Sequence, residues 1–326
     1  MASAAQIKEL LKTHSEGNDE RFYAIAMQVA AAEARKGHAR LAQELRDLVD
    51  RAKLGRGRIA AEPVIHVAQP QGEAADLLEH VRDSRKVSDL VLNPVLARRI
   101  QRILDEQRNA SRIKASGLRP RQRLLFTGPP GCGKTFTASA LANDLGVPLF
   151  VVRLDSLITR YLGESLSKLR LIFDTINRSK AVYFFDEFDS IGFTREFTND
   201  VGEMRRVLNG FLTQIERLKS QSLVIAATNF SERLDKALYR RFDDLVEFGL
   251  PGKAEIWQTV ETLLAGVSKS ALAKEKVLPA AEGLSFAEIT SACEEAIKEQ
   301  IISGKRQIST AMLVNALTER RLLAHH

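Results

Sequence analysis

A short glycine-rich segment carries the clearest chemical signal in the sequence. Gly128–Thr135 reads GPPGCGKT, follows an apolar run and precedes a stretch with helical spacing. Glycines at these positions let backbone N–H groups converge on phosphate oxygens, and the helix that follows adds the favourable end of its dipole. We therefore expect a Walker A loop, with Lys134 at the terminal phosphates of a nucleotide and Thr135 on a magnesium ion. The expected nucleotide contacts in this stretch are Pro130, Gly131, Cys132, Gly133, Lys134, Thr135 and Phe136.

Two adjacent acids close a second apolar run. Ala181–Phe185 is followed directly by Asp186 and Glu187. Taken alone, such a pair is most simply a solvated turn, but in a chain with a phosphate loop it resembles a Walker B motif. We expect Asp186 to join Thr135 in holding magnesium, and Glu187 to polarise the water that attacks the terminal phosphate. These residues predict an ATP hydrolase whose cofactors are ATP and Mg²⁺.

The apolar pattern predicts the elements that position these motifs. Four short apolar runs, at 123–127, 148–152, 181–185 and 223–227, alternate with helical patterns. Runs of this length between helices suit strands that are buried on both faces of a parallel sheet. The predicted fold is an α/β P-loop NTPase core, with a parallel sheet flanked by helices, a C-terminal α-helical lid and a small N-terminal helical domain.

Composition changes divide the chain into four predicted segments. Three apolar stripes at helical spacing predict an N-terminal helical bundle over 1–53, either as a docking groove for a substrate or partner or as plain bundle core. Glycines and prolines after Lys53 predict a flexible linker over 54–80. We expect the α/β ATPase subdomain over 81–250 and the helical lid over 251–326.

The bulk composition excludes several classes of protein. Hydrophobic residues at 44% and charged residues at 27% of 326 are ordinary for a globular protein. Two cysteines without neighbours at metal-ligand spacing exclude a disulfide scaffold and a zinc site. The net charge of +7 fits nucleic-acid binding or the handling of a polyanionic nucleotide. No signal peptide or membrane-spanning run is present, so we expect a cytoplasmic protein without membrane contact.

The motifs across residues 88–316 resemble those of the AAA ATPases. The apolar run that ends at Asn229 resembles the sensor strand of this family, which implies that Asn229 reports the terminal phosphate and helps to orient water. Leu234–Asp243 resembles the second region of homology, where family members place arginines against the nucleotide of the neighbouring subunit. The resemblance makes Arg240 and Arg241 candidate arginine fingers. Many relatives separate the two arginines by Pro-Gly, and here they are adjacent, so which one is the finger stays open.

Two further segments lie where the resemblance places the nucleotide base. Gly283–Ile289 resembles the lid segment that packs on adenine and ribose, which implies a contact at Ala287. Leu90 and Val91 stand where the family closes the other side of the base, although ordinary core packing explains these two residues equally well.

Tyr161, Leu162 and Gly163 match the loop with which protein-threading AAA rings grip polypeptide. An aromatic ring at a loop tip packs against any side chain, and the glycine lets the tip move. The resemblance thus implies a hexamer that remodels, unfolds or threads protein substrates and delivers them to a separate protease or works with an adaptor docked on the N-terminal helices. The chain lacks HExxH and GxSxG motifs, so we do not expect it to cut what it pulls. The alternative is a nucleic-acid-associated AAA+ ATPase of the helicase-loader type, which the solvated helical distribution of the charges disfavours.

Overall fold

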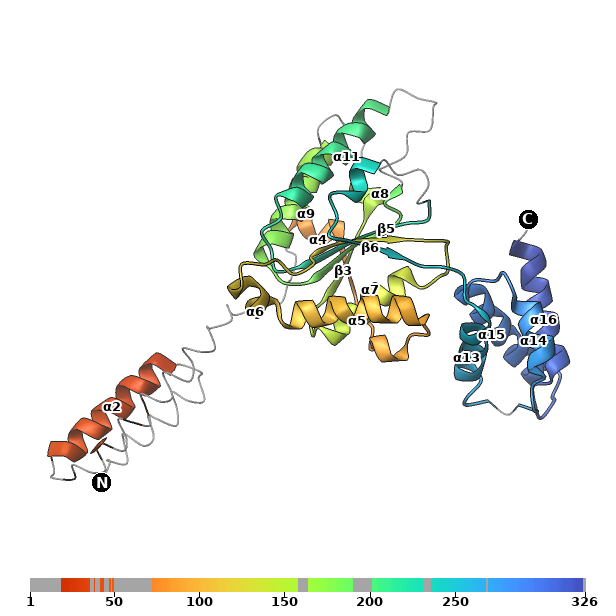
Figure 1. Cartoon of the computed structure of the whole chain (residues 1–326), viewed down its shortest axis with the longest axis horizontal. Coiled ribbons are helices and arrows are strands. Elements are labelled where there is room, and N and C mark those ends of the chain that lie inside the picture. The colour runs from red at the N-terminus through yellow and green to blue at the C-terminus, as the bar shows by residue number, and fades with distance from the viewer. Residues whose placement is uncertain are drawn as a thin grey trace. The chain divides into compact units, whose positions relative to one another are not determined.

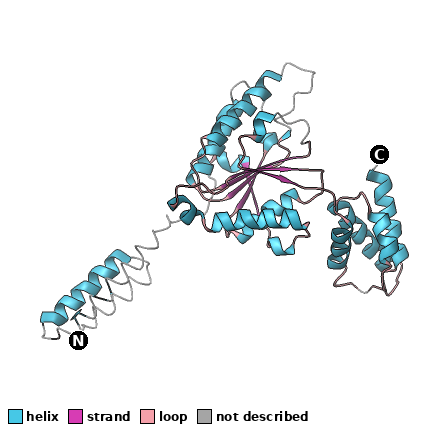
Figure 2. Cartoon of the chain, viewed as in Figure 1, coloured by secondary structure: helices cyan, strands magenta, loops and turns pink. Residues whose placement is uncertain are grey.

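The computed structural model divides the chain into two compact units, Met1–Ile65 and His66–His326. Figure 1 colours the chain from its N-terminus to its C-terminus, and Figure 2 shows the secondary structure. The structure describes residues 19–35, 38, 42, 43, 47, 49, 72–157, 164–189, 201–230, 236–267 and 269–324. Among these residues, no helix is both long and apolar enough to cross a membrane.

The first unit contains helix α2 (Asp19–Arg35), at the place of the second predicted stripe. Ile25, Val29 and Ala30 on this helix are buried, and Ala42 and Val49 are buried as well. The spacing of the three helical residues puts them on one face, which is the pattern of a helix packed on one side. The first predicted stripe and most of the third lie outside the described residues, so the bundle and its docking role stay predictions.

The second unit is built on one six-stranded sheet in the order β1-β3-β4-β5-β2-β6. Every neighbouring pair is parallel except β1 with β3, so the sheet is mixed where the sequence predicted a parallel one. Leu125 on β2 pairs with Ala226 on β5, which in turn pairs with Phe185 on β4. The carboxyl ends of these three strands therefore lie at the same edge. The strands are β1 (Leu78–Val81), β2 (Arg123–Thr127), β3 (Leu149–Val152), β4 (Val182–Phe185), β5 (Leu223–Thr228) and β6 (Asp244–Glu247).

Helices cover both faces of the sheet. On one face α9 and α11 pack on Tyr183 and Phe185, and on the other α5 and α7 pack on Val182 and Phe184 (Figure 1). Successive residues of β4 thus point to opposite cores, as in a strand that is buried on both sides. The helices before the lid are α4 (Glu73–Leu77), the 3-10 helix η1 (Val87–Asp89), α5 (Pro94–Arg108), α6 (Ala110–Ala115), α7 (Lys134–Asp144), α8 (Leu154–Leu157), α9 (Glu164–Arg178), α11 (Val201–Glu216) and α12 (Lys236–Tyr239).

Glu73–Val81 differs from the linker that the sequence predicts over 54–80. These residues form α4 and β1, and β1 adds an antiparallel edge to the sheet by pairing with β3. Glu79 and His80 are exposed, so this short edge strand has no apolar run to mark it. Its pairing partner lies about seventy residues further along the chain, beyond the reach of a local pattern.

The described residues after Gly252 form helices with a core of their own. The helices are α13 (Lys253–Leu263), α14 (Lys274–Ala281), α15 (Phe286–Ile302) and α16 (Thr310–Ala324). Ile256, Val260, Ile289 and Cys293 are buried together in this cluster, at the spacing that predicted helices here. Burial raises the pKa of the Cys293 thiol to about 12, so this cysteine serves packing rather than chemistry.

Candidate nucleotide site

The loop between β2 and α7 curves around the amino end of α7. Gly128, Gly131 and Gly133 have φ of 137°, 72° and 94°, in the region that side chains disfavour. A Cβ on Gly128 would lie 1.9 Å from the carbonyl oxygen of Phe248, and one on Gly131 would lie 2.7 Å from the Ser285 hydroxyl. The loop is therefore a tight cradle of backbone groups at a helix N-terminus, which is the geometry that holds phosphate.

Lys134 lies at the centre of the site. Its side chain is buried, and Nζ donates to the carbonyl oxygens of Gly128 at 2.7 Å and Pro129 at 2.9 Å, and to Asn229 Oδ1 at 2.8 Å. Burial lowers the pKa of this ammonium, while nearby groups that include Asp186 act in the opposite direction. The contact with Asn229 joins the ends of β2 and β5, so the structure brings two of the predicted site residues together.

Two predicted magnesium ligands also meet. Thr135 Oγ1 donates to Asp186 Oδ2 at 3.1 Å, and the backbone N–H of Glu187 donates to the other Asp186 oxygen at 2.9 Å. A hydroxyl and a carboxylate side by side are the hard oxygen donors that Mg²⁺ prefers, so these residues fit that ion. Asp189 Oδ1 is also buried here without a hydrogen-bond partner among the described residues, which leaves a further oxygen acceptor near Lys134.

Glu187 has an unusual backbone. Among the residues that the structure describes, Glu187 is the only non-glycine residue with a positive φ, and its φ is 47°. Such a conformation is uncommon outside glycine and often marks a functional position. It turns the chain off the end of β4, and the side chain of Glu187 is exposed. An exposed carboxylate beside the Thr135–Asp186 pair is suited to contact water.

The lid touches the phosphate loop directly. The N–H of Ala287 donates to the carbonyl oxygen of Gly131 at 3.1 Å, and Ser285 caps α15 beside it. A cavity of about 400 Å³ lies between loop and lid. It is lined by Pro129, Pro130, Gly131, Leu250, Gly283, Leu284, Ser285, Ala287, Glu288 and Arg321. Leu90 and Val91 are half-buried after η1 and do not line this cavity, and Cys132 is buried beneath the loop.

Arg85 is a residue of this region that the sequence did not single out. Its guanidinium carbon lies 3.9 Å from the centre of the Phe136 ring, which is 48% exposed on the first turn of α7. Asp83 accepts from Arg85 Nε at 3.0 Å, and Asn143 donates to the carbonyl oxygens of Ser84 and Arg85. A lone arginine far ahead of the loop gives no sequence signal, because only the fold brings it to Phe136.

The two candidate fingers differ in their contacts. Arg241 is half-buried and forms an ion pair with Glu216 at the end of α11. Arg240 is exposed, and no described residue forms an ion pair with it. The predicted pore loop, Tyr161–Gly163, lies outside the described residues, between α8 and α9, so its role stays a prediction.

Comparison with known proteins identifies the family. Residues 124–250 match the family described as "ATPase family associated with various cellular activities (AAA)". The AAA family ATPase y4kL of Sinorhizobium fredii is 36% identical over 319 residues, which cover 98% of this chain and 96% of that protein. The chain belongs to the AAA family of ATPases, as its sequence motifs indicated.

Two further similarities agree with this assignment. A 26S proteasome regulatory subunit homolog of Methanothermobacter marburgensis is 31% identical over 209 residues, which cover 62% of this chain and 55% of that protein. The crystal structure of the FIGL-1 AAA domain superposes with a TM-score of 0.60 at 22% identity, covering 74% of this chain and 85% of that one. This structural likeness confirms the predicted α/β P-loop NTPase fold.

Proposed function

We propose that the chain is an ATP-hydrolysing motor subunit that works in a hexameric ring and remodels, unfolds or threads protein substrates. The main observation in support of ATP hydrolysis is that the carboxyl ends of several strands lie together at one edge of the sheet. There Lys134 contacts Asn229 at 2.8 Å and Thr135 contacts Asp186 at 3.1 Å. A cation, a magnesium-binding pair and a polar sensor in one place are the parts that phosphoryl transfer requires.

Each residue of the site has a proposed role in hydrolysis. Lys134 and the N–H groups of the loop hold the phosphates, while Thr135 and Asp186 hold magnesium. When bound, magnesium neutralises charge on the phosphate oxygens. Glu187 accepts a hydrogen bond from the attacking water and polarises it, and Asn229 orients that water. Positioning and charge stabilisation then supply most of the rate acceleration.

The proposed ring completes each site with an arginine from the neighbouring copy. Of the two candidates, we infer that Arg240 is the finger, since it is exposed and no described acid pairs with it. Arg241 is occupied by Glu216 and so holds the local structure. An arginine supplied in trans contributes roughly a thousandfold or more to phosphoryl transfer, so assembly would be a condition of activity.

The proposed substrate is polypeptide gripped by Tyr161, Leu162 and Gly163. The name of the M. marburgensis relative, a proteasome regulatory subunit homolog, supports a protein substrate and a separate protease as partner. The N-terminal unit is the proposed docking site for that protease or for an adaptor. Stimulation of ATP hydrolysis by unfolded polypeptide is the expected result, whereas stimulation by DNA or RNA with steep salt dependence would favour the helicase-loader alternative.

Two substitutions test the proposal at separate steps. Glu187→Gln should still bind ATP but hydrolyse it at least about a hundredfold more slowly, because the general base is lost. Tyr161→Ala should hydrolyse ATP normally and fail to unfold a fluorescent reporter protein. Glu282→Gln, an exposed acid of the lid, is the control for loss of a charge. Hydrolysis at the parental rate by Glu187→Gln, or unfolding at the parental rate by Tyr161→Ala, would refute the corresponding role.

A further inference from the structure

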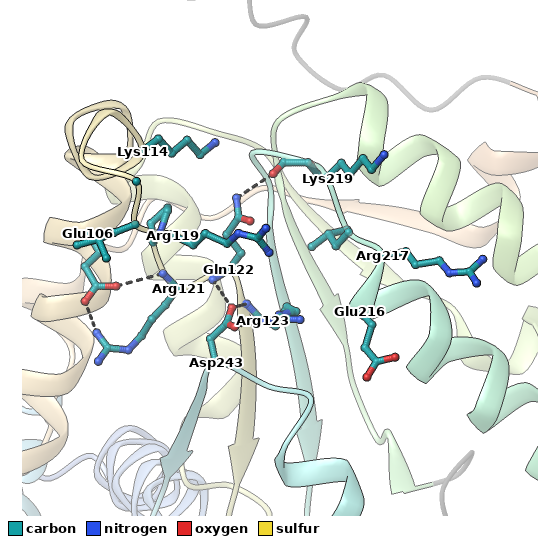
Figure 3. A pocket seen from close by; sticks show the side chains of 15 residues that line it. Glu106, Lys114, Arg119, Arg121, Gln122, Arg123, Glu216, Arg217, Lys219 and Asp243 are labelled. Atoms are coloured by element: carbon teal, nitrogen blue, oxygen red, sulfur yellow. Dashed lines mark hydrogen bonds and ion pairs between the residues drawn. The ribbon is translucent and has the colours of Figure 1, made fainter.

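A second cavity lies at the edge of the sheet opposite the nucleotide loop, where β2, β5 and β6 begin. Its volume is about 800 Å³, within the range of small-molecule sites. One wall is the connection from α6 to β2, and the other is the connection from α11 to β5 (Figure 3). It is lined by Glu106, Lys114, Gly117, Leu118, Arg119, Pro120, Arg121, Gln122, Arg123, Glu216, Arg217, Leu218, Lys219, Ser220 and Asp243.

The acids that line this cavity are all neutralised by arginines. Glu106 pairs with Arg121, and Glu216 pairs with Arg241. Asp243 accepts from the Arg123 guanidinium and, at 2.9 Å, from the backbone N–H of Arg123. Burial pushes the pKa of Asp243 upward, but these hydrogen bonds outweigh burial and hold it below its ordinary value. The three acids of the cavity are therefore already paired with arginine side chains.

Four further cations line the cavity and have no acid partner among the described residues: Lys114, Arg119, Arg217 and Lys219. All four are exposed. In Figure 3, Lys114 and Arg119 extend from one wall toward the other, whereas the charged ends of Arg217 and Lys219 on the opposite wall point away from that pair. The positive charges of Lys114 and Arg119 repel each other, and an anion bound between these two side chains would relieve that repulsion.

The lining indicates which kind of anion fits. The two walls are joined by a hydrogen bond of 2.8 Å from Gln122 Nε2 to the carbonyl oxygen of Ser220, so the cavity is formed in advance. No aromatic side chain lines it, so it offers nothing on which a nucleobase could stack. Guanidinium and ammonium groups are the usual donors to phosphate oxygens, and one group of each kind on the same wall, Lys114 and Arg119, suits a compact ligand with several charges.

We propose that this cavity binds a compact polyanion of the phosphate class, at a site separate from the nucleotide loop. Lys114 and Arg119 bind its charged oxygens from one wall, and Arg217 and Lys219 on the other wall add to the positive potential that attracts it. The inference does not depend on the proposed function, because it rests on a different edge of the sheet. It also places an anion site next to Glu216, the partner of Arg241.

The experiment titrates tripolyphosphate into the full chain carrying Lys134→Ala, which disables phosphate binding at the nucleotide loop, and follows binding by calorimetry. Adding Lys114→Gln and Arg119→Gln together should weaken binding by about tenfold or more, since two charge-assisted hydrogen bonds are lost. The matched control is Lys305→Gln with Arg306→Gln, which removes the same two charges from an exposed turn of the lid.

Equal weakening by the control pair would mean general charge attraction and would overturn the proposal. Parental affinity in the cavity variant, or tighter binding of a single-stranded oligonucleotide or of polyglutamate at equal charge, would overturn it as well. Lys134 is buried, so the titration is repeated in the unsubstituted chain in case its variant does not fold. There the cavity substitutions should remove one of two binding events and leave the rate of ATP hydrolysis unchanged, which separates this test from that of the proposed function.

Discussion

Phe136 exposes 48% of its surface next to the phosphate loop, with Arg85 on one face of its ring. An exposed ring on the first turn of α7 is within reach of the base or ribose of a nucleotide whose phosphates lie at the helix end. We expect Phe136→Ala to weaken ATP binding by about tenfold, because stacking on an aromatic ring is worth about 1–3 kcal/mol per base. Affinity for tripolyphosphate at the loop should not change. Displacement of a fluorescent ATP analogue measures both.

The control for Phe136 is Ile302→Ala, which removes an 82% exposed apolar side chain from the lid. It should change neither affinity. Arg85→Gln should act in the same direction as Phe136→Ala, but more weakly, because the ring remains. If Phe136→Ala lowers the affinities for ATP and tripolyphosphate equally, the ring supports the loop and does not contact the base.

Gly128 is constrained both by its backbone and by its neighbour. Its φ is 137°, and a Cβ would lie 1.9 Å from the Phe248 carbonyl oxygen, next to the hydrogen bond that joins Phe248 to Thr127. Gly128→Ala should therefore lower the free energy of unfolding by about 3 kcal/mol or more, as measured by urea denaturation. Gly249→Ala, with open space around its Cβ, should change it by no more than about 0.5 kcal/mol. Equal stability of the two variants would contradict this account.

Short motifs singled out residues that the structure brings together at the loop, but they did not predict the contacts around them. Lys134, Thr135, Asp186 and Asn229 each follow a strand or begin a helix, and parallel strands bring such positions to one edge whatever the rest of the fold. Arg85 reaches Phe136 only because Asn143 holds residues 84 and 85 against α7. Contacts of that kind depend on tertiary packing, which one sequence does not show.

At the scale of elements, Asp243 fastens the start of β6 to β2. Its pKa lies below the ordinary value of 3.8, because hydrogen bonds from Arg123 and the Gln122 N–H outweigh the upward effect of burial. A carboxyl group with a lowered pKa in the folded state stabilises the fold at pH values above its ordinary pKa. This contribution disappears as the pH falls through the folded-state pKa. Asp243→Asn should lower the free energy of unfolding by about 1–2 kcal/mol at neutral pH. The difference in the free energy of unfolding between the parent and Asp243→Asn should disappear below pH 3.8.

Urea denaturation at neutral and acidic pH measures this gap. Asp174→Asn on α9 is the matched control, an exposed aspartate for which no described residue provides a hydrogen bond or ion pair. Its effect should be small at every pH. A gap between parent and Asp243→Asn that persists unchanged in acid would show that the carboxylate charge is not what stabilises β6.

The position of each strand in the sheet explains which strands the sequence could predict. β2, β3, β4 and β5 are apolar runs because they are covered on both faces. β1 and β6 are edge strands with polar residues such as Glu79 and Glu247 exposed, so they carry no apolar run. An edge strand is specified by its pairing partner, and for β6 that partner is β2, far away in sequence.

For the whole molecule, the proposed ring requires that one copy completes the site of the next. The Arg240→Ala variant has an intact nucleotide site but supplies no arginine to its neighbour. The Lys134→Ala variant supplies that arginine but does not bind nucleotide in its own site. Each variant alone should be nearly inactive, because an arginine in trans supplies about a thousandfold of the rate. Mixed in equal amounts, the two should recover about one quarter of the parental ATPase rate. That is the share of sites in a randomly mixed ring where an intact loop meets an intact finger.

Mixing Glu187→Gln with Lys134→Ala is the control for this complementation. Both substitutions damage the part of the site that binds and hydrolyses the nucleotide, and both leave Arg240 in place. No copy in a mixed ring then has an intact nucleotide site, so the rate should stay near zero. If Arg241→Ala recovers activity in the mixture and Arg240→Ala keeps its activity alone, then Arg241 is the finger, and the Glu216 pair must break on assembly. If a chain lacking both arginines hydrolyses ATP at the parental rate, no neighbour contributes, and the chemistry belongs to the single copy.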